Sequence, residues 1–240
     1  MPFSEHYHAE AADPDCIEPQ VATAMLSRLP WRRLVVLGDS VAAGIMAPVD
    51  GYRNECFADR FGSALAETRD PFLYRNLAVR DLRIAEIHQQ QVPAALALRP
   101  DVAMVVAGGN DALGRKFDPG AVRDKLEALI RPLHDAGAIV ITIGLFDLAR
   151  SGLMPPEVRA LMTERFDALD ELTAAVSAAF GGIHVDTHSH PRSADPDIYS
   201  PDKIHANARG HGIAFKSIVE TVAHWHGESG EHQVRPRPAP

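Results

Sequence analysis

The sequence has few cysteines and no hydrophobic run long enough for a membrane helix. Its two cysteines, Cys16 and Cys56, exclude a disulfide framework, and we expect two free thiols in a reducing compartment. The longest apolar run, residues 138–146, is far shorter than the ~20 residues that a bilayer requires. Residues 1–20 lack the basic start and apolar core of a secretory signal. These features predict a soluble, cytoplasmic protein.

Positive charge is also scarce. The 240 residues include 24 Lys and Arg against 32 Asp and Glu, a formal net charge of -8. An acidic surface argues against nucleic acid as the main partner and against an anionic membrane surface, so we expect neither nucleic-acid binding nor membrane insertion. The sequence has no G-x-G-x-x-G or Walker pattern, which argues against a nucleotide-binding loop.

Short apolar runs alternate with helical stripes through most of the chain. The runs predict strands at 33–37, 72–77, 101–107, 138–144 and 183–186, and the stripes predict helices at 54–68, 81–98, 156–180, from 118 onward and from about 207 to 225. We expect Pro93 to bend or split the helix at 81–98. Five strands alternating with helices predict a parallel sheet between two helical layers, a three-layer α/β/α domain.

The ends of the chain differ in composition from its middle. Residues 1–30 are acidic and predict an arm with at most a short helix at 21–29. Residues 31–227 are predicted to form the folded domain. Residues 228–240 are rich in Pro, Gly, Glu and Arg and predict a flexible tail, because they bury too little apolar area to offset the cost of ordering.

The first predicted strand ends in Gly38-Asp39-Ser40. The glycine allows a tight exit from the strand, and the Asp39 side chain is short enough to bond neighbouring backbone amides. Ser40 would then project from the loop beyond the strand, at the sheet edge where open α/β folds place their active sites. Taken alone, the tripeptide is equally consistent with an ordinary strand-to-helix turn.

Asp202 and His205 lie three residues apart, just ahead of the last predicted helix. A nucleophilic serine needs a base, and the base needs a carboxylate that fixes its tautomer and stabilises the imidazolium. This spacing places both side chains on one side of the loop. In isolation, the pair is also consistent with two surface residues.

Two further blocks follow predicted strands. Gly108-Gly109-Asn110-Asp111 combines glycines that permit close backbone approach with the side-chain amide of Asn110, a donor suited to an oxyanion hole. Asn76 to Asp81 leads into a helix start, where backbone N–H groups are unpaired. Each block alone is also typical of an ordinary turn or capped loop.

Together, in this order, the four blocks resemble the SGNH-hydrolase family, also called GDSL esterases/lipases, over roughly residues 33–225. The resemblance implies a flavodoxin-like fold and no metal or organic cofactor. It implies Ser40 as nucleophile, His205 as general base and Asp202 as its partner. It also implies an oxyanion hole formed by the Ser40 N–H, a backbone N–H of the second block at Asp81, and the Asn110 side chain.

Asp81 departs from the bacterial form of the second block, in which a glycine usually stands at this position. Its backbone N–H is retained, but a conformation with positive φ is harder for aspartate than for glycine. The carboxylate would repel an oxyanion if it faced the site. We expect it instead to cap the following helix.

The substrate expected from the resemblance is a small ester, with a short or O-acetyl acyl group, since no long apolar lid is present. Candidate substrate-binding residues are Asp39, Tyr52, Gly109 and Phe146, and residues 148–154 predict a partly apolar rim. The sequence leaves open hydrolysis or acyl transfer to an alcohol acceptor. It does not determine the oligomeric state.

Two other interpretations compete with a serine esterase. His184, Asp186, His188 and His190 cluster at alternate positions that suit Zn²⁺, although no H-E-x-x-H pattern or cysteine pair accompanies them. A noncatalytic flavodoxin-like module could hold a phosphate at a helix N-terminus, with Ser40 as a donor. That second interpretation leaves the pair of Asp202 and His205 without a role.

Overall fold

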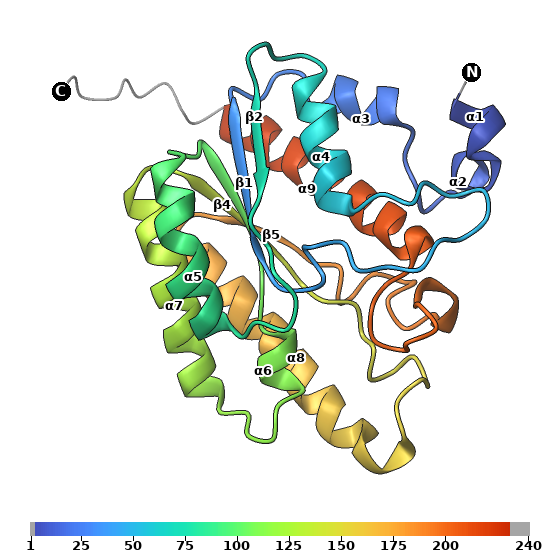
Figure 1. The fold of residues 1–240 in the computed structure, drawn as a ribbon, viewed down its shortest axis with the longest axis vertical. Helices are drawn as coiled ribbons and strands as arrows, with labels where there is room; N and C mark the ends of the chain where they lie inside the picture. The colour runs from blue at the N-terminus through green and yellow to red at the C-terminus, as the bar shows by residue number, and fades with distance from the viewer. Residues whose placement is uncertain (1–2, 231–240) are drawn as a thin grey trace.

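The computed structural model describes residues 3–230 and contains a five-stranded parallel sheet. The strands are β1 (Arg33–Gly38), β2 (Leu73–Asn76), β3 (Val102–Val106), β4 (Ile139–Ile143) and β5 (Ile183–Val185), in the order β2-β1-β3-β4-β5 (Figure 1). This order is the flavodoxin-like one, in which the chain reverses direction across the sheet at β1 and β3. The predicted parallel α/β/α fold is confirmed.

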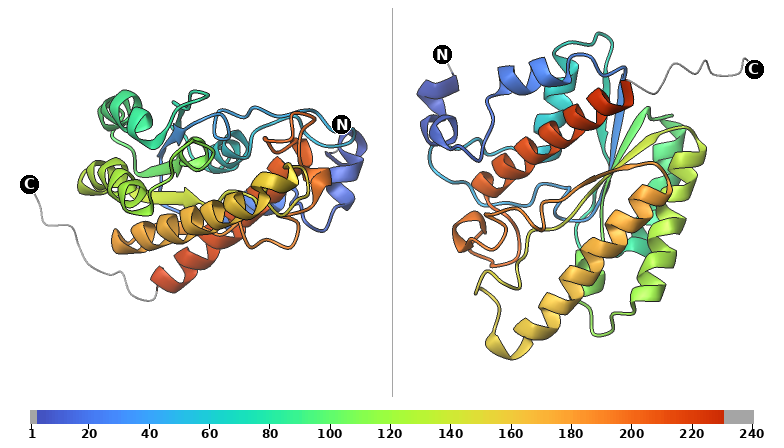
Figure 2. Two further views of the ribbon diagram at one scale, coloured as in Figure 1. Left: turned by 90° about the horizontal axis from the view of Figure 1, so that it is seen from below. Right: turned by 180° about the vertical axis from the view of Figure 1, so that it is seen from behind.

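Helices cover both faces of the sheet, as the end-on view in Figure 2 shows. One layer contains α3 (Pro19–Leu26), α4 (Phe57–Ala66) and α9 (Ala208–Gly230). The other contains α5 (Ile84–Ala97), α7 (Pro119–Asp135) and α8 (Pro156–Ala179). Two hydrophobic cores result, one on each side of the sheet.

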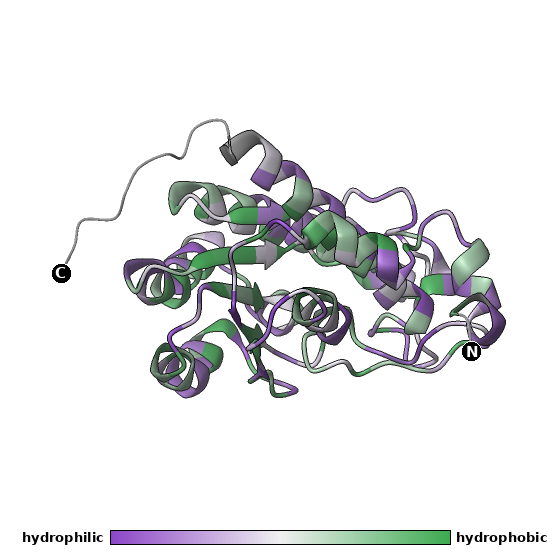
Figure 3. Cartoon of the chain, turned by 90° about the horizontal axis from the view of Figure 1, so that it is seen from above, coloured by the Kyte–Doolittle hydropathy of each residue, from purple (hydrophilic) through white to green (hydrophobic). Residues whose placement is uncertain are grey.

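The central strands β1, β3 and β4 are mainly apolar because both of their faces are buried. In β1, Leu34 and Val36 pack into the core beneath α4 and α9, while Val35 and Leu37 pack into the core beneath α5 and α7. Successive side chains of a strand point to opposite faces of the sheet, so one strand contributes apolar residues to both cores. Hydrophobic residues, green in Figure 3, accordingly dominate the strands.

Helix boundaries differ from the predicted ones at a few positions. The predicted start of α7 is confirmed, since the Asp118 carboxylate accepts a hydrogen bond from the Ala121 N–H at 3.2 Å and Pro119 opens the helix. Helix α5 begins at Ile84 rather than at Asp81, and it continues through Pro93 as a single helix. Proline therefore does not split this element.

The N-terminal residues form more structure than the predicted arm. They contain α1 (Phe3–His6), α2 (His8–Ala12) and α3, which starts before the predicted position. Acidic side chains of the predicted arm make ion pairs with the domain. Glu10 is buried, and its carboxylate lies 2.7 Å from the Arg60 guanidinium and 2.8 Å from that of Arg53.

At the other end of the chain, α9 extends beyond the predicted Trp225 to Gly230. Most of the predicted tail at 228–240 lies outside the described residues. Cys16 and Cys56 are free thiols, as expected. Within the described part of the chain, no helix combines the length and the apolarity needed to cross a bilayer.

Candidate active site

Ser40 lies two residues beyond the end of β1, in a loop that Gly38 makes possible. A Cβ atom at Gly38 would lie 2.4 Å from the carbonyl oxygen of Val106, so only glycine fits between β1 and β3. The Gln91 side chain bonds both backbone groups of Gly38, and the Asp39 carboxylate accepts the Val41 N–H at 3.0 Å. These contacts fix the turn from which Ser40 projects.

The structure places Ser40, His205 and Asp202 in one hydrogen-bonded chain. The Ser40 Oγ lies 2.7 Å from the His205 Nε2, and the His205 Nδ1 lies 2.7 Å from the Asp202 Oδ2. Burial raises the pKa of Asp202, but the hydrogen bonds from the His205 ring and from the backbone N–H groups of Ile204 and His205 outweigh it, so this pKa is lowered. The carboxylate is therefore ionised and positioned to orient the imidazole.

The loop that carries Asp202 and His205 is closed by its own hydrogen bonds. The Ser200 N–H donates to the His205 carbonyl at 2.7 Å, and Tyr199 and Ala206 form an isolated antiparallel bridge. Asn207, at the start of α9, donates its side-chain amide to the carbonyls of Asp197 and Tyr199. The imidazole thus sits on a braced loop rather than on a free one.

Two backbone N–H groups at the site, those of Ser40 and Asp81, are free to bind a ligand. Within residues 3–230, neither the Ser40 N–H nor the Asp81 N–H donates a hydrogen bond to another protein group. Both residues line the same pocket as Asn110. The Asn110 amide donates to the Leu82 carbonyl at 2.9 Å and makes a longer contact of 3.4 Å with the Asp39 carboxylate.

The expectation that Asp81 caps α5 is wrong. The N-cap of α5 is Arg83, and the exposed Asp81 carboxylate instead pairs with the Arg80 guanidinium at 2.8 Å. The φ angle of Asp81 is 68°, in the left-handed region that favours glycine but that aspartate tolerates better than most residues. The carboxylate is therefore held by Arg80, while the N–H remains in the pocket lining.

Asn110 is positioned by a one-turn helix, α6 (Gly109–Ala112), directly after β3. Gly108 precedes it with φ of 108°, and a Cβ at this position would lie 2.5 Å from the Leu169 side chain on α8. Glycine thus permits both the left-handed backbone and the close approach of α8. The turn directs the chain from the strand end into the pocket.

Asp39 is a buried carboxylate at the floor of the site, 2% exposed. Burial raises its pKa to about 6, although the hydrogen bond from the Val41 N–H and the nearby His205 oppose the shift. Its position next to Asn110 links the loops after β1 and β3. Asp39 therefore shapes the site without being a member of the chain from Ser40 to Asp202.

The pocket around Ser40 has a volume of about 160 Å³. Three of the predicted substrate-binding residues, Asp39, Gly109 and Phe146, line it. Tyr52 does not, since its hydroxyl donates to the Asp13 carboxylate at 2.8 Å and belongs to the docking of the N-terminal residues. The rest of the pocket wall is mostly apolar: Leu113, Leu145, Leu148, Phe166, Tyr199 and Ile204.

Most of this apolar wall was not predicted from sequence. Phe166 belongs to the helical stripe of α8, and a core helix residue carries no local signal that it reaches a pocket. Leu148 falls within the predicted rim at 148–154, and Ile204 lies between Asp202 and His205. The sequence therefore indicates a position near the site for Leu148 and Ile204, but it does not indicate one for Phe166.

The candidate metal residues of the sequence do not converge. His184 contacts Thr142 at 3.0 Å and Asp170 at 3.3 Å, whereas His188 lies 2.8 Å from Asp167. Asp186 accepts a hydrogen bond from the Ser189 N–H within its own loop. The His190 Nδ1 accepts the Arg192 N–H at 3.0 Å. The four side chains thus serve separate local contacts.

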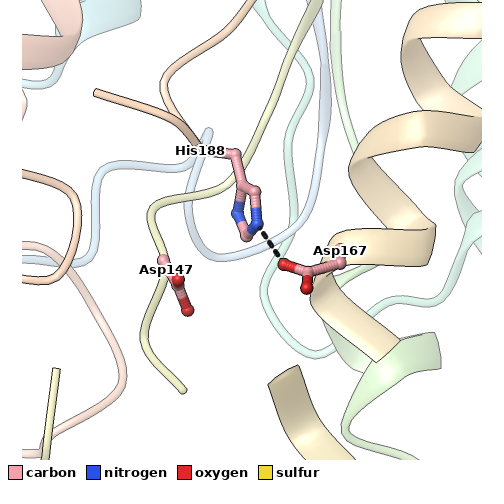
Figure 4. A group of neighbouring side chains, drawn as sticks. All are labelled: Asp147, Asp167 and His188. Atoms are coloured by element: carbon pink, nitrogen blue, oxygen red, sulfur yellow. Dashed lines mark hydrogen bonds and ion pairs between the residues drawn. The ribbon is translucent and has the colours of Figure 1, made fainter. Parts of the chain in front are cut away.

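A different group of side chains does converge near the pocket, and it consists of Asp147, Asp167 and His188 (Figure 4). The Arg150 guanidinium bonds both carboxylates, at 2.6 Å to Asp147 and 2.6 Å to Asp167. Its hydrogen bonds hold the pKa of Asp167 down at about 2. A cation therefore already balances these carboxylates.

This ionic cluster ties the loop after β4 to α8 and to the segment after β5. The loop supplies Leu145, Phe146 and Leu148 to the pocket wall. The Asp147 N–H also donates to the Ser193 hydroxyl at 2.8 Å, and the His188 ring bonds the Leu145 carbonyl at 2.9 Å. These contacts fix this apolar part of the pocket wall.

Comparison with known proteins identifies the family of the chain. The family model described as the GDSL-like lipase/acylhydrolase family matches residues 36–213, which include all four predicted blocks. No curated protein sequence matches the chain.

Solved structures of similar fold cover most of the chain. The lipase/acylhydrolase from Enterococcus faecalis is 20% identical, with a TM-score of 0.62, over 87% of this chain and 100% of that one. A variant of Axe2, an acetyl xylan esterase from Geobacillus stearothermophilus, is 16% identical, with a TM-score of 0.61, over 85% and 97% of the two chains. TesA is 19% identical, with a TM-score of 0.60, over 80% and 99%. At these identities the likeness establishes a shared fold.

Proposed function

The chain belongs to the GDSL-like lipase/acylhydrolase family and is a hydrolase that acts on ester bonds, and we propose that it is a serine esterase for small esters with short acyl groups. The single observation that carries this proposal is the unbroken chain from Asp202 through His205 to Ser40, at the edge of an apolar pocket. A noncatalytic binding module would give these two hydrogen bonds no role.

In the proposed reaction, His205 Nε2 takes the proton of Ser40 as its Oγ attacks the ester carbonyl. The tetrahedral intermediate then collapses, and the C–O bond to the alcohol breaks as His205 returns the proton to the leaving oxygen. The same imidazole next deprotonates a water, which attacks the acyl-serine. Collapse of the second intermediate releases the acid and restores the Ser40 hydroxyl. Asp202 stabilises the imidazolium in both halves.

Three donors are suited to bind the oxyanion of both intermediates. The Ser40 and Asp81 N–H groups are unpartnered in the described structure, and one N–H of Asn110 has only a long contact. Donors that are positioned before reaction cost little reorganisation as charge develops. We assign these three groups to the oxyanion hole.

The size and lining of the pocket support a short acyl group. Its 160 Å³ is close to the ~150 Å³ of an apolar protein cavity that binds benzene, so it has room for about six non-hydrogen atoms. Leu145, Leu148 and Phe166 offer an apolar wall to an alkyl chain. Two acetyl xylan esterases among the structures of similar fold are consistent with short acyl groups.

The test is hydrolysis of 4-nitrophenyl esters of increasing acyl length by the purified protein and by Ser40→Ala. We expect activity to be highest for short chains, and both activity and labelling by a fluorophosphonate to disappear in Ser40→Ala. Ser63→Ala, which removes an exposed serine on α4, serves as the matched control and should retain both. Labelling or turnover that survives in Ser40→Ala would show that another residue is the nucleophile.

Product analysis with added alcohol separates hydrolysis from acyl transfer. Hydrolysis predicts free acid as the main product at all alcohol concentrations. A new ester that replaces the acid would instead identify acyl transfer as the main reaction.

A further inference from the structure

Three cationic side chains surround a hollow next to the pocket. Arg83, Arg115 and Lys116 line this depression, which has a volume of about 570 Å³. All three residues are exposed, and none of them forms an ion pair with a carboxylate among residues 3–230. In a chain with a net charge of -8, these three cations gather around one hollow.

The hollow adjoins the proposed oxyanion hole. Asp81 and Leu113 line the pocket, and Arg83 and Arg115 each follow one of them by two residues. Two residues of chain span at most about 7 Å, so the backbone of each arginine lies close to a residue of the pocket lining.

The two loops are also held against each other. The Ile84 N–H donates to the Asp111 carboxylate at 3.0 Å, and the Arg83 guanidinium lies beside Gly114. In Figure 1 this is where α6 lies beside the beginning of α5. The three cations therefore share one surface.

The carboxylates on these loops are already engaged. Asp81 pairs with Arg80, and Asp111 pairs with Lys125 and accepts the Ile84 N–H. Glu86 accepts the Arg83 N–H, and Asp118 caps α7. None of these carboxylates compensates the three cations of the hollow directly. An anionic ligand in the hollow would therefore meet cations that no carboxylate of the described chain has engaged.

We propose that this hollow binds an anionic oxygen group, a carboxylate or a phosphate, carried by the ester substrate. The proposal rests on the proposed esterase function and narrows its substrate class to negatively charged esters. Arginine presents a planar fork of donors that matches such groups, and lysine adds a mobile point charge. The anion would anchor the substrate while its ester carbonyl lies at Ser40.

The contribution expected of the hollow is moderate, because its side chains are exposed. An exposed ion pair changes an equilibrium by roughly 1.4- to 5-fold, so removal of two cations should raise KM for an anionic ester about 2- to 25-fold. The kcat should change little, since the contact is the same in the ground and transition states. Salt should weaken the preference, because ions screen exposed charges.

The experiment compares matched neutral and anionic esters. 4-Nitrophenyl hexanoate and 4-nitrophenyl hydrogen adipate differ in the charge of the acyl group, and methyl 4-acetoxybenzoate and 4-acetoxybenzoate differ in the charge of the alcohol part. Each pair is assayed with the wild type, with the double variant Arg115→Gln/Lys116→Gln, and with the control Arg28→Gln/Arg123→Gln. The control residues are also exposed and remove the same charge elsewhere.

We expect the wild type to prefer the anionic member of one pair, which also identifies the part of the substrate that carries the charge. The hollow variant should lose this preference through KM, while the control retains it. Equal loss in both double variants, or a wild type that hydrolyses neutral esters without charge preference, would overturn the proposal and leave the esterase function intact. A protein inert toward all four esters would instead refute the esterase function itself.

Discussion

The side-chain amide of Asn110 has two N–H groups and one firm partner in the resting site, the Leu82 carbonyl. Its second N–H has only the 3.4 Å contact with Asp39, and it is available to a developing oxyanion. We predict that Asn110→Ala lowers kcat by about 10²–10³ and leaves KM nearly unchanged, because the donor acts mainly in the transition state. Steady-state kinetics with a short-chain ester measures both constants, and an unfolding curve tests whether the fold is retained. An unaltered kcat would remove Asn110 from the mechanism.

Single residues with a chemical signature were predictable from the sequence, and residues that act only through position were not. Ser40, Asp202 and His205 could be selected because nucleophile, base and carboxylate are distinctive residue types at strand ends. Phe166 gave no such signal, since an aromatic residue in a helical stripe is usually a core residue. Tyr52 was wrongly assigned to the pocket because its partner, Asp13, is distant in sequence. Long-range pairing of this kind has no local pattern.

At the scale of elements, the buried carboxylate of Glu10 on α2 is one of the contacts that join the N-terminal residues to the domain. The Glu10 side chain is fully buried, as is that of its partner Arg60. We predict that Glu10→Gln lowers the free energy of unfolding by about 3–5 kcal/mol, because it leaves a buried guanidinium without its counter-ion. Urea unfolding measures the change.

Glu5→Gln is the matched control for this experiment, since Glu5 is exposed on α1. It should alter the unfolding free energy by no more than about 0.5 kcal/mol. Similar values for the two variants would contradict a structural role for the buried carboxylate.

The N-terminal residues also show why the sequence predicts an arm at this end of the chain. Acidic residues in a short, weakly periodic segment resemble a solvated tail, because each partner lies far away along the chain. Glu10 meets Arg60, and Asp13 meets Arg209. In elements with strong periodicity, the predicted start of α7 is confirmed and the predicted bounds of β3 differ by one residue at each end. The hydrophobic pattern shows which of their residues are buried, so no particular long-range pair has to be known to predict them.

At the scale of the whole molecule, the layered sheet could be predicted because its strands and helices alternate and because parallel strands must be buried on both faces. The sheet then brings three strand ends to one edge. The loops after β1, β2 and β3 meet there with the loop before α9, which explains how residues 165 positions apart form one hydrogen bond. The pocket walls depend on how α8 and the loop after β4 pack, and packing detail is not encoded in local pattern.

The global stability of the molecule should depend on pH through a histidine outside the proposed chemistry. His211 is 1% exposed, its Nδ1 accepts the Phe57 N–H at 3.2 Å, and its ring stacks on that of Phe57. Burial, with smaller contributions from the charges of Arg60 and His205, lowers its pKa to about 3. The folded protein therefore keeps this ring neutral under mildly acidic conditions, while the unfolded chain takes up a proton below its ordinary pKa of ~6.5.

The sign of this effect follows from the lowered pKa. The contribution of His211 is fully present above pH ~6.5 and is lost as pH falls toward 3, by about 2 kcal/mol at pH 5. His211→Asn keeps an acceptor for Phe57 but does not titrate. We predict that its free energy of unfolding falls by about 2 kcal/mol less than that of the wild type between pH 7.5 and pH 5. Urea unfolding at both values measures the difference. Asp39 shifts stability in the opposite direction, since its pKa is raised, but it is present in both proteins and cancels. His88→Asn, on partly exposed α5, is the control, and parallel profiles for the wild type and His211→Asn would refute the prediction.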